Sequence, residues 1–300
     1  MVPNPLFSFS LFGKTVSVYL YGIMIAIGLI ACLIVYYVYT SKKNINREVQ
    51  DFGFIVAILS IALGFVFAKL FQAVYDFIET GKFDFYSAGI TAMGGFIGGA
   101  AVFIVAYFGV GHFIFGGKKD NIHLKDFNKI LLAAPCCITI AHAFGRIGCL
   151  MAGCCYGEFL GYEPTVGGLY MRCGGTWGYY VPTQLYEALF LFVLFAALSV
   201  LYFKDFNITP HVYLIAYGIW RIIIEVFRTD ERGAIVLGLA PSQWMSILFM
   251  VGGAALFLLY YLKKIPFRFK NAEKQAQPLP VAQTEETEPK DDKTKNEDNE

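Results

Sequence analysis

The sequence predicts an all-α polytopic membrane protein with about seven transmembrane helices, its N-terminus outside and its C-terminus in the cytoplasm. Three observations predict this fold: the composition, the spacing of apolar stretches and the distribution of positive charge between them. Only 16% of the 300 residues are charged and 57% are apolar, whereas a soluble domain carries about 25% charged residues. The sequence does not combine a basic patch with the composition of a soluble domain, so we expect no nucleic-acid partner.

Seven apolar stretches approach the roughly 20 residues that a helix needs to cross a bilayer. They cover residues 16–39, 52–75, 85–111, 130–150, 188–203, 212–227 and 244–262. The first is charge-free and too long for the core of a signal peptide, so it is expected to remain as a span. The second carries only Lys69, whose long side chain can extend to the membrane surface. The third is rich in glycine, which suits close helix packing.

The remaining stretches differ in the polar residues that they carry. The fourth contains His142 and Arg146, and the sixth contains Arg221 and Glu225. The fifth is short and purely apolar, and residues 184–187 before it are expected to lengthen its helix. The seventh is free of charge. Ionisable groups within a span are costly and usually functional, so the fourth and sixth spans are the candidates to form a site.

Positive charge is unequally divided between the two sets of alternating loops. One set, which includes Lys42, Lys43 and Arg47, holds eleven Lys and Arg residues against five in the other. Because Lys- and Arg-rich loops stay in the cytoplasm, the N-terminus is expected outside and the C-terminus inside. The membrane domain is expected to cover residues 1–265, and residues 266–300 to form a disordered, charged cytoplasmic tail.

With this orientation, the polar residues of the spans fall at one depth near the outer face. A helix advances about 1.5 Å per residue, which puts Arg146, Arg221 and Glu225 in the outer parts of their spans. Gln184 and Glu187 begin the fifth span on the same side. A charge inside the bilayer costs about 2.5–3.5 kcal/mol on insertion scales, so this coincidence indicates a site.

These arginines admit two explanations. Arg221 and Glu225 are spaced i,i+4 and could simply neutralise each other, and Arg146 could extend to the membrane surface. Two guanidinium groups at one depth also make a strong phosphate site, because each can bind two phosphate oxygens. A phosphate at that depth belongs most simply to a phospholipid. The residues alone therefore favour an enzyme or binding protein for lipid headgroups.

Four local strings then carry a family resemblance. Residues 145–157, Gly-Arg-Ile-Gly-Cys-Leu-Met-Ala-Gly-Cys-Cys-Tyr-Gly, resemble the signature segment of prolipoprotein diacylglyceryl transferases in a Cys-rich variant. The strings at 182–187, at 217–221 with Glu225 and Arg228, and at 243–246 follow in the order of that family. Tyr21-Gly22 resembles the Tyr-Gly of its first helix. The similarity covers roughly residues 15–262 and implies the same seven-span layout.

The resemblance implies transfer of the diacylglyceryl group of phosphatidylglycerol to the lipobox cysteine of lipoprotein precursors, at the outer leaflet of a bacterial plasma membrane. It implies no cofactor and no metal. The family's functional arginines correspond to Arg146 and Arg221, which would stabilise the departing phosphate, with Glu187 and Glu225 orienting them. The expected substrate-binding residues are Tyr21, Gly94, Gly95, Gly157, Gln184, Glu187, Tyr217, Glu225 and Arg228.

Three departures from the family pattern change the expected mechanism. Many members have a histidine, a proposed base, where this chain has Met93, and Cys149 and Cys154 replace the usual Asn and Glu. His142, one turn before Arg146, is the candidate substitute, since an imidazole can accept a proton near neutral pH. The expected catalytic residues are therefore Arg146, Arg221 and His142.

The cysteines near the outer face leave further alternatives open. Cys149, Cys154, Cys155 and Cys173 are first expected to form a disulfide or to pack as thiols. Their spacing is not a standard zinc pattern, so a metal site is a distant second alternative and a catalytic thiol a third. A thiol-redox protein and a lipid-headgroup transferase with another acceptor are alternative functions. A small-solute transporter is a third alternative function. The clustering of the charges at one depth argues against it, because a transporter would line a path across the bilayer with polar groups.

Overall fold

The computed structural model describes residues 5–11, 14–87, 89–116, 121–229 and 241–262. Helices make up most of these residues. They are α1 (Leu20–Lys42), α2 (Arg47–Thr80), α3 (Ala92–Val105), the π-helix η1 (Ala106–Val110), α4 (Gly111–Phe115), α5 (Ile122–Ala152), α6 (Thr183–Phe203), α7 (Thr209–Val226) and α8 (Pro241–Tyr261). The tail predicted for residues 266–300 lies outside the described residues.

Every apolar stretch singled out in the sequence lies largely on a helix. Five helices of the described chain are long and apolar enough to cross a membrane: Leu20–Lys42, Arg47–Ile78, Ala92–Phe115, Ile122–Ala152 and Thr183–Phe203. The third of these joins α3, η1 and α4 without a break. Because α7 and α8 are not among the five, the prediction of a predominantly helical membrane protein is confirmed, while the count of seven spans stays a prediction.

The expectation of an all-α chain is wrong for two segments. Strands β1 (Phe7–Leu11) and β2 (Lys14–Val18) form an antiparallel hairpin before α1, so residues 16–18 of the first predicted span are strand. Strands β3 (Phe159–Gly161), β4 (Leu169–Cys173) and β5 (Thr176–Tyr180) form a sheet of order β3-β5-β4 between α5 and α6. The start of the third predicted span, before α3, is also not helical.

A glycine pair explains why β4 and β5 turn back on each other. Gly174 and Gly175 have φ angles of 55° and 88° and form the whole loop of the hairpin. A two-residue hairpin loop with both φ angles positive is one that glycine adopts without steric cost. Flanked by Leu169–Cys173 and Thr176–Tyr180, this pair was a readable strand signal that the helical interpretation did not use.

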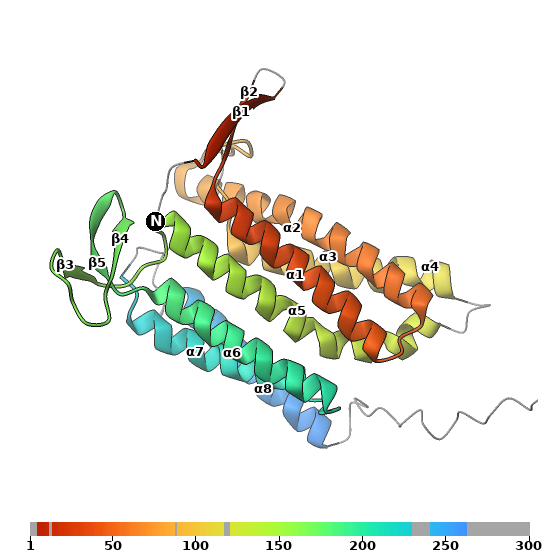
Figure 1. Cartoon of the computed structure of the whole chain (residues 1–300). Helices are drawn as coiled ribbons and strands as arrows, with labels where there is room; N and C mark the ends of the chain where they lie inside the picture. The colour runs from red at the N-terminus through yellow and green to blue at the C-terminus, as the bar shows by residue number, and fades with distance from the viewer. Residues whose placement is uncertain (1–4, 12–13, 88, 117–120, 230–240, 263–300) are drawn as a thin grey trace, which may run out of the picture. The chain divides into compact units, whose positions relative to one another are not determined.

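The helices lie side by side in antiparallel neighbours (Figure 1). Helix α1 packs on α5, α2 on α3, α6 on α5, and α8 on α7. Loops that the charge pattern assigned to one membrane side do meet at one end of the helices. Lys43 forms an ion pair with Asp205, and Asn46 N donates to Asp126 Oδ2 at 2.9 Å. These contacts join the segment after α1 to the segment after α6 and to the start of α5.

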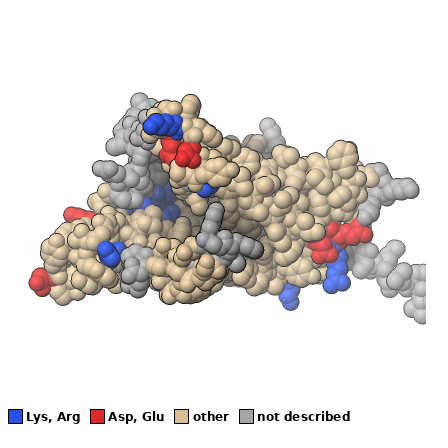
Figure 2. All heavy atoms as spheres, turned by 90° about the horizontal axis from the view of Figure 1, so that it is seen from above, with Lys and Arg blue, Asp and Glu red and all other residues tan. Residues whose placement is uncertain are grey.

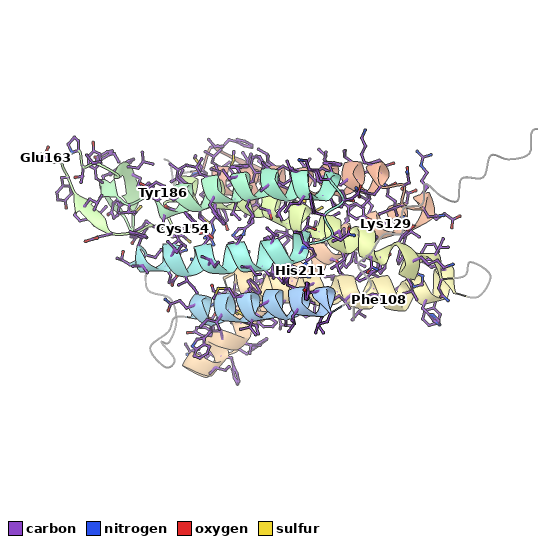
Figure 3. The ribbon with its side chains drawn as sticks, turned by 90° about the horizontal axis from the view of Figure 1, so that it is seen from below. Phe108, Lys129, Cys154, Glu163, Tyr186 and His211 are labelled. Atoms are coloured by element: carbon purple, nitrogen blue, oxygen red, sulfur yellow. The ribbon has the colours of Figure 1, made fainter. Side chains whose placement is uncertain are left out.

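The face in Figure 2 carries its charged side chains toward the two ends, with an uncharged stretch between them. In Figure 3, Cys154 and Tyr186 lie near the end with the β3–β5 sheet, and His211 and Lys129 lie away from it. Lys69 is not isolated on α2, because its Nζ donates to Tyr86 O at 2.9 Å. The arrangement is the one expected of helices crossing an apolar layer.

Two small residues bring α1 close to α5 and so position the first candidate site residue. A Cβ at Gly28 would lie 2.9 Å from Ala141 O, and one at Gly148 would lie 3.2 Å from Tyr21 Cδ2. A side chain at Gly28 would force α5 to shift, and one at Gly148 would require Tyr21 to move by a few tenths of an ångström. As a result, Tyr21 packs against the last turns of α5, beside the segment that carries Arg146 and the cysteines.

Candidate functional site

The carboxylate of Glu187, near the start of α6, lies at the centre of the site. Its side chain is 1% exposed, and groups from two other helices contact it. Arg146 Nε of α5 lies 3.1 Å from Oε2. Tyr217 of α7 donates its hydroxyl to Oε1 at 3.2 Å. Three helices are thus joined through one buried anion, which the positive charge of Arg146 compensates.

His142 lies one turn before Arg146 on the same face of α5. Arg146 Nε donates to His142 Nε2 at 3.2 Å, and Glu187 Oε1 lies 3.8 Å from that nitrogen. The imidazole ring stands edge-on to Tyr217, with ring centroids 5.2 Å apart. Because Nε2 accepts a hydrogen bond, the imidazole is neutral with its proton on Nδ1 in this arrangement.

Arg221 brings a second buried guanidinium to the same region. Its side chain on α7 is 10% exposed, and Nη1 lies 3.1 Å from Glu225 Oε2. The guanidinium groups of Arg146 and Arg221 both interact electrostatically with the Glu187 carboxylate. Nη1 of Arg221 has no aligned hydrogen-bond acceptor within the described part of the chain. The predicted i,i+4 pair is confirmed, and it leaves guanidinium hydrogen-bonding capacity in the site.

Gly157 and Arg228 are joined through their backbones, which links the segment after α5 to the end of α7. They form an isolated antiparallel bridge. A Cβ at Gly157 would overlap Phe227 O and lie 2.9 Å from Thr183 Cγ2. Glycine is therefore required at 157 by close approach, and the bridge holds Arg228 near the other site residues. Arg228 also acts electrostatically on Glu187.

The start of α6 holds the cysteine-bearing segment in place. Gln184 Nε2 donates to Cys154 O at 2.6 Å, and Thr183 Oγ1 donates to Cys155 O at 2.7 Å. Gln184 is 1% exposed. The contacts of Gln184 are thus structural, although its buried Oε1 has no partner among the described residues.

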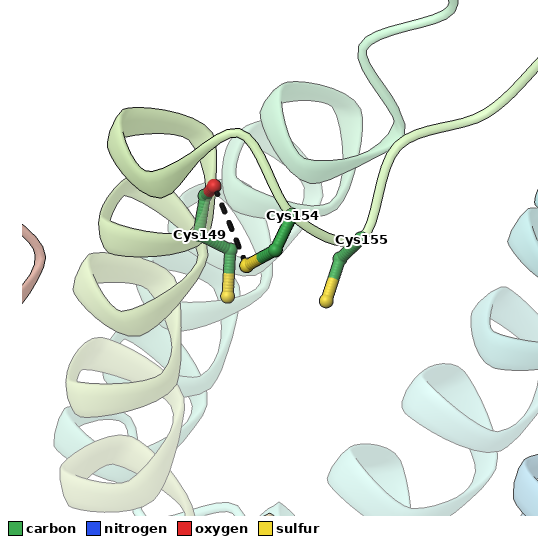
Figure 4. A group of neighbouring side chains, drawn as sticks. All are labelled: Cys149, Cys154 and Cys155. Carbon is green, nitrogen blue, oxygen red and sulfur yellow. Dashed lines mark hydrogen bonds between the residues drawn. The ribbon is translucent and has the colours of Figure 1, made fainter. Parts of the chain in front are cut away.

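Three of the cysteines gather at the end of α5. The Sγ atoms of Cys149, Cys154 and Cys155 all lie within 4.8 Å of one another (Figure 4). All three are free thiols. The neighbouring thiols of Cys149 and Cys154 lower the pKa of Cys155 well below its usual range, and the guanidinium groups of Arg228 and Arg146 contribute. Cys154 Sγ itself donates to Cys149 O at 3.7 Å (Figure 4). No spacing rule predicted this cluster, because Gly153, with φ of 68°, turns the chain back at the end of α5.

Cys173 does not join this group. It is a free, buried thiol on β4, packed with Leu150, Met171 and Tyr180. Burial raises the pKa of the Cys173 thiol to about 11. Cys173 is therefore a packed thiol, and all four of the cysteines that the sequence singled out near the outer face are free thiols in the structure.

A cavity of about 580 Å³ opens between the start of α1 and the end of α5. It is lined by the end of β2, the start of α1 with Tyr21 and Gly22, and by Met151 and Ala152 at the end of α5. Tyr21 also interacts electrostatically with Cys149, Cys154, Cys155 and Arg146. The cavity is therefore lined by a residue that the sequence predicted for substrate binding.

Two predicted substrate-binding residues make other contacts. The atoms nearest to a Cβ at Gly94 or Gly95 belong to α2: Phe71 and Phe67 for the first, Ala68 and Gly64 for the second. Both glycines thus serve the packing of α3 on α2. Their part in substrate binding stays a prediction. Met93, which stands where the resemblance implies a histidine, is 40% exposed.

Comparisons with known proteins place this arrangement in context. The family model for prolipoprotein diacylglyceryl transferase matches residues 7–259. A phosphatidylglycerol–prolipoprotein diacylglyceryl transferase of Dehalococcoides mccartyi is 32% identical over 254 residues, covering 81% of this chain and 89% of that protein. Enzymes of the same name from Clostridium tetani (30% identical; 85% and 98% covered) and Clostridium perfringens (number 2; 29% identical; 86% and 96% covered) are also similar.

Proposed function

This chain belongs to the prolipoprotein diacylglyceryl transferase family, and we propose that it transfers the diacylglyceryl group of phosphatidylglycerol to the lipobox cysteine thiol of lipoprotein precursors. One observation carries the proposal beyond the family: Arg146 of α5 pairs with the buried Glu187 carboxylate, and Arg221 of α7, paired with Glu225, interacts electrostatically with the same carboxylate. With Arg228, the described part of the site has three guanidinium groups and two carboxylates, and so an excess of positive charge for a phosphate.

The reaction is a displacement at a glycerol carbon of the lipid. The acceptor sulfur attacks this carbon, a C–S bond forms, and the C–O bond to the phosphate breaks. Glycerol phosphate leaves with the electron pair. Arg146 and Arg221 would stabilise the charge that develops on the departing oxygen, and their paired carboxylates, Glu187 and Glu225, would hold them in position.

His142 is the proposed acceptor of the thiol proton. Its Nε2 lone pair is directed at Arg146 Nε, so protonation there would put two cations together. Glu187 Oε1, 3.8 Å away, would offset the second charge. Replacement of His142 by Gln keeps a polar side chain but removes the base; slower transfer with retained thermal stability would support the role, and unchanged transfer would exclude it.

The proposed setting is a bacterial plasma membrane crossed seven times, with the site at the outer face. The relatives named above are bacterial enzymes, and five helices are suited to crossing. In support of a chain that crosses back and forth, the loops after α1 and α6 and the start of α5 lie at the same end of the helices. The site residues belong to the other end, with the β3–β5 sheet.

The direct test uses the purified full chain in phosphatidylglycerol vesicles with a lipobox peptide. The proposal predicts a peptide whose mass grows by one diacylglyceryl group on cysteine, together with release of glycerol phosphate. The peptide with Ser in place of Cys is the matched control. Modification of another acceptor, with none of the peptide, would instead favour a different lipid-headgroup transferase.

A further inference from the structure

The thiol cluster of Cys149, Cys154 and Cys155 has no part in the displacement described above. Each sulfur can reach the other two: all three Sγ atoms lie within 4.8 Å of one another. Figure 4 draws them where the last turn of α5 meets the returning chain. Cys154 is exposed and the other two are half-buried, so the group is accessible from one side.

This geometry fits a thiophilic metal ion. With Zn–S bonds of about 2.3 Å, the sulfurs around a tetrahedral zinc ion stand about 3.8 Å apart. The three thiols need only small side-chain rotations to reach this spacing. Thiolates are the ligands that select zinc over hard cations such as magnesium and calcium. Zinc sites with three protein ligands keep a fourth position for water or substrate, which is the arrangement of catalytic zinc.

The surroundings favour a negatively charged complex. Three thiolates on Zn²⁺ leave one net negative charge, and a fourth thiolate makes two. Both Arg146 and Arg228 act electrostatically on Cys155, and Arg146 acts on Cys149 and Cys154 as well. The two guanidinium groups thus match the charge of a zinc ion that holds four thiolates.

The backbone at Cys155 also indicates a role for its side chain. Its φ of 62° lies in the left-handed region, where glycine is favoured. Thr183 Oγ1 fixes this conformation by donating to Cys155 O at 2.7 Å. A non-glycine residue in such a conformation is strained, and strained residues of this kind gather at functional sites.

We propose that Cys149, Cys154 and Cys155 bind a zinc ion whose fourth position takes the acceptor cysteine of the substrate. The inference rests on the proposed function and adds a metal that neither the cysteine spacing nor the family resemblance predicted. Met151 and Ala152, between Cys149 and Cys154 in the chain, line the cavity that also contains Tyr21, and Arg146 stands one turn before Cys149. Zinc would thus hold the nucleophilic sulfur near the guanidinium that receives the lipid phosphate.

The metal changes only how the acceptor thiol loses its proton. When the thiol binds zinc, its S–H bond breaks, the sulfur keeps the electron pair and the proton passes to His142 or water. The zinc-bound sulfur then attacks the glycerol carbon, and glycerol phosphate leaves as before. The product is a neutral thioether, a poor ligand compared with a thiolate, and it dissociates to restore the three-thiolate site.

Metal binding is tested on the purified full chain, stripped with a chelator and then dialysed against Zn²⁺ alone. One zinc per chain is expected by elemental mass spectrometry. Cys149→Ser and Cys154→Ser should lose it. Cys155→Gly should lose it too, while its thermal stability stays the same or rises because glycine suits the φ of 62°. Cys32→Ser, outside the cluster on α1, is the control that should keep the metal. Full zinc content in all three cluster variants would overturn the inference.

The fourth position is tested with Co²⁺ in place of Zn²⁺ and no lipid. Addition of the lipobox peptide should strengthen the sulfur-to-cobalt absorption, and its Ser counterpart should not. An unchanged spectrum with the Cys peptide would overturn the assignment of the acceptor site. Transfer at the full rate by the chelator-stripped enzyme would also overturn the inference. A disulfide between two cluster cysteines, found by mass spectrometry of the native enzyme, would overturn it as well. These results leave the proposed function intact, whereas a metal-loaded enzyme without any transfer would contradict that function instead.

Discussion

Glu187 is the residue on which the geometry of the other site side chains depends. It has a buried carboxylate that pairs with Arg146 and accepts the hydroxyl of Tyr217. The sequence predicted that Glu187 and Glu225 orient the arginines. Glu187 contacts Arg146 and Glu225 contacts Arg221, and the orienting role stays a prediction. The Arg221–Glu225 pair could be read from its spacing alone, because residues four apart share a helix face.

Replacement of Glu187 by Gln should damage both stability and transfer. The change removes the anion but keeps the shape, and leaves Arg146 buried beside a neutral amide. Removing one partner of a buried ion pair costs about 3–5 kcal/mol. We therefore expect a lower midpoint in thermal unfolding in detergent and strongly reduced transfer. Replacement of the exposed Glu158 by Gln, in the nearby loop, is the control that should change neither.

The contacts among Arg146, His142 and Glu187 were only partly predictable. The sequence predicted their common depth, since helix rise converts position into height. The rotation of α5 against α6, on which the 3.1 Å contact between Arg146 and Glu187 depends, could not be predicted in this way, whereas the 3.2 Å contact between Arg146 and His142 lies within α5. Packing at Gly28 and Gly148 sets the position of α1 against α5, and such close approaches are properties of pairs of helices.

At the scale of elements, the segment between α5 and α6 decides whether the site assembles. It bridges to the end of α7 through Gly157 and Arg228, and its peptide oxygens are held by Thr183 and Gln184 of α6. The helical interpretation of the sequence missed the three strands in this segment. Their alternation is short and only the Gly174–Gly175 pair marks them, whereas apolar stretches of span length dominate the chain.

Replacement of Gly157 by Ala should separate the loop after α5 from α7. The added methyl group would overlap Phe227 O and crowd Thr183. Overpacking of this kind costs about 1–3 kcal/mol, and relief by movement would displace Arg228. We expect reduced transfer and a lower unfolding midpoint. Gly145→Ala is the matched control, because a Cβ there meets nothing within 4 Å. If the two variants transferred equally well, the bridge would have no part in the site.

At the scale of the whole molecule, the charge pattern and the contacts at the helix ends both place the Lys- and Arg-rich loops at one end of the helices. The loops richer in Lys and Arg come together through Lys43–Asp205 and Asn46–Asp126. The direction of the chain through the membrane follows from the positive-inside rule, which acts during insertion and leaves no contact in the folded protein. The site and the β3–β5 sheet are expected on the outer side.

A membrane-impermeant thiol reagent tests this orientation in intact bacterial cells. In a Cys154→Ser background, which removes the exposed native thiol, a cysteine at Glu163 should be labelled without permeabilisation. One at Asp205 should be labelled only after it. The reverse pattern would show that the chain is inserted the other way, and that the site faces the cytoplasm.

The central claim is that Arg146 and Arg221 together stabilise the departing phosphate. The most direct measurement is the kcat of diacylglyceryl transfer from phosphatidylglycerol to a lipobox peptide for Arg146→Gln and Arg221→Gln. Arg172→Gln, on β4 and outside the site, is the control. Loss of one donor to a developing anion costs about 10²–10³ in kcat. Each site variant should therefore lose about that much rate while remaining folded; a folded Arg146→Gln or Arg221→Gln enzyme with the kcat of the unmodified chain would contradict the account.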